Sequence, residues 1–146
     1  MVHALEEIRR LLKPGGILVD IHPVPEGSLT EVRQGESVLY SERTMETSSN
    51  SVILAEKALA QVVEQGFFKI EKHAWFDFFT YADSAGELSA YWEEQEAFDI
   101  RSDDDPQAVR ERMLYAQAEE IMKASGEGAL VVTHERAGVT RLRALE

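Results

Sequence analysis

The chain has 146 residues, contains no cysteine and carries a formal net charge of −12 at pH 7. This length suits one domain with a sizeable core, and the lack of cysteine excludes disulfides and thiolate metal sites. The acidic charge argues against a partner made of nucleic acid or an anionic membrane surface, because both need a basic protein face.

The sequence also lacks the apolar segments of membrane and exported proteins. No apolar run approaches the roughly 20 residues of a bilayer-spanning helix, and the charged start MVHALEEIRR has no signal-peptide core. We therefore expect a cytoplasmic protein that forms a single domain over residues 1–146.

The first predicted element is an amphipathic helix over residues 2–13, whose apolar positions follow helical spacing. The turn Lys13-Pro14-Gly15-Gly16 ends it, because proline and the glycines do not continue a helix. The next run, residues 17–23, is almost continuously apolar and is typical of a strand covered on both faces, as in a parallel sheet.

Residues 26–50 are polar and predict a hairpin with strands at 29–33 and 37–42, followed by a loop and helix cap at 47–50. A second helix is predicted over residues 51–65 and ends at Gly66. The segment 67–81 predicts a long strand, and its aromatic far end indicates burial on both faces.

The last third predicts two helices and a strand pair. One helix covers residues 84–96, and another begins at the cap Ser102–Pro106 and runs to about Ala124. After Gly126-Glu127-Gly128 the pattern indicates strands over 129–135 and 139–145, or one bent strand. This order mixes the habits of the α/β and α+β classes.

Known catalytic and phosphate-binding motifs fit poorly. Gly126-Glu127-Gly128 precedes a strand, whereas the dinucleotide fingerprint follows one, and the chain has no P-loop and no GxSxG elbow. His73 and Asp77 lie four residues apart on a strand, but a metal site needs further ligands, and a solvated strand end explains them better. The run Asp103–Asp105 lacks the spacing of a calcium loop and is typical of a helix cap.

Asp20 and His22 are the most informative titratable pair. Alternate residues share one face of a strand, and these two lie at a strand end, where open α/β sheets place their ligand crevices. A structural histidine is the alternative. The aromatic residues, among them Trp75 and Tyr81, either line a small-ligand pocket or form the core. We name Asp20, His22, Trp75 and Tyr81 as pocket candidates and assign no catalytic, cofactor-binding or metal-binding residue.

The segment HALEEIRRLLKPGGILV, residues 3–19, resembles the helix–turn–strand segment of class I S-adenosylmethionine-dependent methyltransferases. In that family a helix ending in leucine-lysine-proline-glycine-glycine leads into the fifth strand of the sheet. The later elements agree more loosely. The resemblance implies a partial Rossmann-like sheet made of strands five, six and seven, with an inserted hairpin and packed helices.

The resemblance also has implications for the cofactor. In that family the first half of the domain holds the methyl donor, through a glycine-rich loop, an acidic residue ending strand two and a polar residue near strand three. No position of this chain matches them, so we expect no cofactor here, and S-adenosylmethionine only if an N-terminal half is supplied. The strand end at residues 21–23 falls on the acceptor-substrate side of a complete enzyme.

In the complete fold, strand five is paired on both sides, but its inner neighbour, strand four, has no counterpart in this chain. A bare apolar edge formed by Ile17, Leu18, Val19 and Ile21 invites association. Either the hairpin near residues 29–42 covers it or two copies pair edge to edge. We therefore predict a homodimer that binds neither nucleic acid nor membrane.

Besides a small-ligand pocket, the residues and the resemblance leave two functions open. The first is a methyltransferase-like binding or interaction module that is not catalytic alone. The alternative is the C-terminal portion of a split or truncated methyltransferase that acts on a small molecule, completed by a partner chain carrying the cofactor-binding half.

Overall fold

The computed structural model describes residues 2–44, 50–95 and 104–145. In these ranges it contains four helices and five strands, which belong to a mixed fold consistent with the α+β class. In chain order they are α1 (Val2–Leu11), β1 (Ile17–Pro23), β2 (Leu29–Gln34), β3 (Ser37–Arg43), α2 (Asn50–Glu64), β4 (Phe68–Ala82), α3 (Ala85–Gln95), α4 (Pro106–Ser125) and β5 (Ala129–Ala144). The predicted loop at 47–49 and the residues Ser102 and Asp103 of the predicted cap lie outside the described residues.

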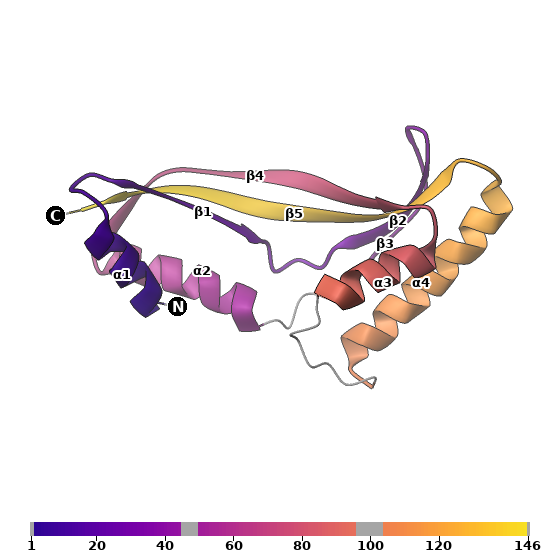
Figure 1. Cartoon of the computed structure of the whole chain (residues 1–146), viewed down its shortest axis with the longest axis horizontal. Coiled ribbons are helices and arrows are strands. Elements are labelled where there is room, and N and C mark those ends of the chain that lie inside the picture. Colours follow the sequence, from indigo (N-terminus) through magenta and orange to yellow (C-terminus); the bar gives the residue numbers. More distant parts are fainter. Residues whose placement is uncertain (1, 45–49, 96–103, 146) are drawn as a thin grey trace. The chain divides into compact units, whose positions relative to one another are not determined.

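Strand β5 is the centre of the sheet (Figure 1). It pairs antiparallel with β1, from Ile17↔Arg143 to Pro23↔Ala137, and antiparallel with β2, from Leu29↔His134 to Gln34↔Ala129. It also pairs with β4, while β2 forms the predicted hairpin with β3. Of the two alternatives predicted for residues 129–145, the single strand is confirmed, and the hairpin pairs with β5 instead of covering β1.

The chain divides into two compact units, and β4 and β5 pass through both. Unit 1 comprises residues 1–25, 47–77 and 136–146, and unit 2 comprises residues 26–46 and 78–135. Each unit has its own group of buried apolar residues.

In unit 1, helices α1 and α2 pack against each other, and their apolar sides share a core with the sheet. The turn between α1 and β1 requires its glycines. Gly15 has a φ of 71°, and a Cβ on Gly16 would lie 2.8 Å from the carbonyl oxygen of Lys13. The buried residues of this core are Leu5, Ala58, Val62, Phe68, Leu142 and Ala144.

In unit 2, α4 packs against α3 and against both strands of the hairpin. It begins after Asp105 with proline in its first turn, as predicted, although the Asp105 side chain makes no capping hydrogen bond. The buried core consists of Val32, Ala82, Leu88, Ala118, Ala129 and Val131.

Two expectations about burial are wrong. The run that forms β1 is not covered on both faces, because its residues alternate between half-buried and exposed. The aromatic end of β4 is not covered on both faces either, since Trp75, Phe79 and Tyr81 are all exposed. In both strands the apolar sequence predicted burial on both faces, but among the described residues one face of each strand is exposed.

Candidate functional site at strand β1

The backbone of β1 has one paired edge and one outward edge. Ala144 donates its N–H to the carbonyl of Gly16 (2.9 Å), and Val24 donates its N–H to the carbonyl of Arg136 (3.0 Å). Opposed residues of an antiparallel pair alternate between hydrogen-bonded and non-hydrogen-bonded. The even-numbered residues of β1 therefore bond to β5, and the N–H and C=O groups of Ile17, Val19 and Ile21 point away from it.

This outward edge has no strand partner among the residues that the structure describes. Pro23 lies at an outward position, so its missing N–H costs no bond to β5. The side chains of Val19 and Ile21 are 54% and 60% exposed. Leu18, by contrast, packs against the core of unit 1. Of the four predicted edge residues, Ile17, Val19 and Ile21 form the open edge, and Leu18 turns its side chain inward.

Asp20 and His22 lie on the same face of β1 as Leu18 and contact each other, as their spacing predicts. The Nδ1 atom of His22 is 2.6 Å from Oδ2 of Asp20. The His22 side chain is 15% exposed and the Asp20 side chain is 22% exposed. A carboxylate that accepts a hydrogen bond from Nδ1 orients the imidazole, and in the neutral ring Nε2 is then the proton acceptor. Chemically this pair is an oriented base at the end of a strand.

A second imidazole approaches the same face of β5 from β4. The register places Thr140 opposite Asp20 and Gly138 opposite His22. His73 Nδ1 lies 2.7 Å from Oγ1 of Thr140, and its Cε1 atom is 3.4 Å from the position that a Cβ on Gly138 would take. A Cβ at position 138 would therefore be in ordinary van der Waals contact with this imidazole.

The aromatic candidates are only partly connected to this face. Trp75 belongs to unit 1 and contacts His73 edge to face, with ring centroids 4.5 Å apart. Tyr81 belongs to unit 2, where its ring neighbours that of Phe79. The structure therefore brings Asp20 and His22 into contact and places Trp75 against a histidine, whereas Tyr81 belongs to the other unit.

His73 was considered in the sequence only as a metal ligand with Asp77. In the structure the two have separate partners. The Nε–H group of Arg136 donates a hydrogen bond to Asp77 at 2.8 Å, whereas His73 contacts Thr140. Within residues 2–44, 50–95 and 104–145 there is no group of three or more side chains that could hold a metal ion. The link between His73 and Thr140 spans 67 positions, so no local sequence signal could have indicated it.

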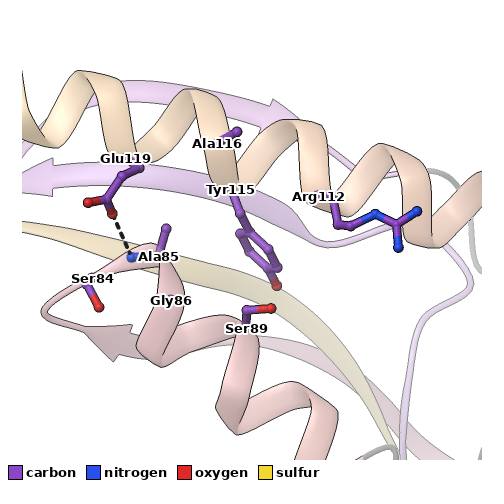
Figure 2. Close-up of a pocket in the computed structure, with 8 residues that line it drawn as sticks. All are labelled: Ser84, Ala85, Gly86, Ser89, Arg112, Tyr115, Ala116 and Glu119. Atoms are coloured by element: carbon purple, nitrogen blue, oxygen red, sulfur yellow. Dashed lines mark hydrogen bonds between the residues drawn. The ribbon is translucent and has the colours of Figure 1, made fainter. Parts of the chain in front are cut away.

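Two hollows in the described part of the chain contain none of these residues. A hollow of about 430 Å³ lies between α3 and α4. Figure 2 shows the residues that line it, which include Ser84, Arg112, Tyr115 and Glu119. Oε2 of Glu119 accepts the N–H of Ala85 at 3.2 Å, so the positive end of α3 already has a carboxylate. Another hollow, of about 290 Å³, lies beside α1. Since neither hollow includes the Asp20–His22 pair, we take the strand edge as the candidate site.

Comparison with known proteins adds no identification: no family model, no curated protein and no solved structure matches this chain. None of the helices in the described part of the chain has the length and apolarity needed to cross a membrane. The function must therefore be argued from the residues and their geometry.

Proposed function

We propose that this chain is a methyltransferase-like association module that pairs with a second copy of itself through the outer edge of β1 and does not hold S-adenosylmethionine alone. The observation that carries the proposal is the outward edge of Ile17, Val19 and Ile21, with two exposed apolar side chains. The resemblance supports it, because the segment of residues 3–19 leads into a strand that has two neighbours in the complete methyltransferase fold. Here β1 has only β5 among the described residues.

A two-fold axis favours one register of this pairing. If the axis passes through Asp20, two carboxylates face each other, which is unfavourable. If it passes through Val19, Ile17 lies opposite Ile21 of the second copy, and Leu18 lies opposite Asp20 of the second copy. The outward groups then form about six backbone hydrogen bonds, since each hydrogen-bonded pair exchanges two.

The test uses the chain as it is. Size-exclusion chromatography with light scattering at micromolar concentration is expected to give twice the 16.4 kDa mass of one chain. A monomer at that concentration would contradict the association. Calorimetric titration with S-adenosylmethionine is expected to show no binding, and micromolar affinity would contradict the second part of the proposal.

The Asp20–His22 contact favours a second candidate function. An oriented base on the acceptor-substrate side suits the C-terminal portion of a split methyltransferase, in which Nε2 of His22 would take a proton from the acceptor. The described residues match none of the family's positions for the methyl donor, so no step is assigned to that cofactor.

A reconstituted complex tests this alternative. A partner chain that carries a glycine-rich strand–turn–helix segment should restore methyl transfer when mixed with this chain. Replacing His22 by alanine should then lower the rate by about 100-fold, as expected for loss of a general base. Replacing the exposed Leu39 of β3 by alanine is the matched control, and it should leave the rate of methyl transfer unchanged. Equal rates for wild type and His22→Ala would contradict the role of His22.

A further inference from the structure

Unit 2 contains a buried carboxylate that the association proposal does not use. Glu31 on β2 is only 4% exposed. Its Oε2 atom accepts a hydrogen bond from the Nε–H group of Arg33 at 2.6 Å. Its Oε1 atom lies 3.1 Å from Nδ1 of His134 and accepts a hydrogen bond from the hydroxyl of Ser41 at 3.5 Å. A buried charge is costly unless it is paired. The surrounding groups therefore hold Glu31 in one arrangement, and Glu31 in turn holds them.

This cluster lies on the face of the sheet away from the core of unit 2. Val32 and Val131 are opposed across the pairing of β2 with β5, and both lie in the core with residues of α3 and α4. Because side chains alternate along a strand, Glu31 and Arg33 project from the other face. That face carries the ion pair and its neighbours.

An aromatic surface adjoins the cluster. The guanidinium carbon of Arg33 lies 4.7 Å from the centroid of the Phe79 ring, and the His134 ring lies 4.4 Å from the same ring at an angle of 34°. The ring of Tyr81 is 6.2 Å from that of Phe79, and both are exposed. A cation over an aromatic ring is favourable, so Phe79 contributes to fixing the guanidinium.

Arg33 is oriented through only one of its nitrogens. Its Nε donates to Glu31, whereas neither terminal nitrogen donates to another described residue. A guanidinium presents its donors in a planar fork that matches a carboxylate. Since Glu31 and Phe79 have already restricted the side chain, a ligand would lose little further conformational freedom on binding.

We propose that Arg33, held by Glu31 and Phe79, binds the carboxylate of a small aromatic acid, whose ring packs against Phe79 and Tyr81. The chain carries a net charge of −12, so general electrostatic attraction cannot recruit this anion, and recognition rests on the oriented guanidinium and the exposed rings. This inference does not depend on association through β1, because all of its residues belong to unit 2.

The test compares benzoate with benzamide, which has the same ring and no charge, by NMR titration of the wild-type chain. Benzoate is expected to give saturable shifts at the Arg33 side chain and at Tyr81, with binding at least about tenfold tighter than benzamide. Equal binding of the two probes, or no saturable shift with benzoate, would overturn the proposal. This comparison needs no variant and is independent of folding effects.

A pair of matched variants localises the site. Arg33→Lys keeps the charge but loses the planar fork, so it should weaken benzoate binding about tenfold. Arg136→Lys changes another strand arginine that is bonded to a carboxylate, that of Asp77, and should leave benzoate binding unchanged. Benzoate affinity that falls in Arg136→Lys and not in Arg33→Lys would contradict the assignment to Arg33.

Discussion

The replacement Ile21→Pro tests the proposed edge pairing most selectively among single substitutions. The N–H of Ile21 points away from β5, because the even-numbered residues of β1 form the bonds to that strand. Proline removes this donor and leaves the β1–β5 ladder intact. The preceding residue, Asp20, is already in a strand, the conformation that proline favours at that position.

The size of the effect follows from the register about Val19. In that register the Ile21 N–H of each copy donates to the carbonyl of Ile17 in the other copy, so the substitution removes two bonds per dimer. Each backbone hydrogen bond contributes about 1 kcal/mol net. The loss of about 2 kcal/mol corresponds to a dissociation constant raised about 30-fold.

Sedimentation equilibrium over a concentration series measures this constant. Ile21→Val is the matched control, since it keeps the N–H and the branched side chain, and it should change the constant by no more than about threefold. Circular dichroism should be the same for both variants. If Ile21→Pro dimerises with the wild-type constant while remaining folded, the N–H of Ile21 is not in the interface and the reasoning fails.

Three further predictions concern stability and the Asp20–His22 pair. Burial raises the pKa of the Glu135 carboxyl in the folded chain above its value in the unfolded chain. The protonated carboxyl therefore favours the folded state fully at pH values below the unfolded pKa, and this stability is lost as the pH rises through the folded pKa. Glu135→Gln should therefore raise the melting temperature at pH 7 and leave it unchanged near pH 3; no gain at pH 7 would contradict this. Leu88→Ala, at a fully buried position, should cost about 2–5 kcal/mol in urea unfolding, whereas the exposed control Tyr91→Ala should cost far less. Asp20→Ala should release Nδ1 of His22, which ¹⁵N NMR detects as a change from the Nδ1–H to the Nε2–H tautomer; an unchanged tautomer would show that Asp20 does not set it.

The local features of this fold could be predicted because short segments determine them. The turn Lys13-Pro14-Gly15-Gly16 ends α1 since its glycines meet a positive φ and a close carbonyl. The hairpin of β2 and β3 follows from two short polar-flanked strands around Gly35, whose φ is 59°. The contact of Asp20 with His22 follows from the period of two along a strand.

The remaining features depend on residues that are far apart in the chain. The apolar sequence of β1 indicated burial on both faces, but the exposure of Val19 and Ile21 depends on which distant segments cover that face of the sheet. The hairpin pairs with β5 because that strand is long enough to carry two partners in succession, which no local pattern of the hairpin itself indicates. The cluster around Glu31 could not be predicted for the same reason, since His134 is 103 positions away in the chain.

Amide hydrogen exchange along β1 tests the central claim most directly. The amides of Leu18 and Asp20 bond to β5 and should exchange slowly at every protein concentration. The outward amides of Val19 and Ile21 should exchange slowly at concentrations where the dimer forms and quickly on dilution. Fast exchange of Val19 and Ile21 at every concentration would contradict the pairing of this edge with a second copy of the chain.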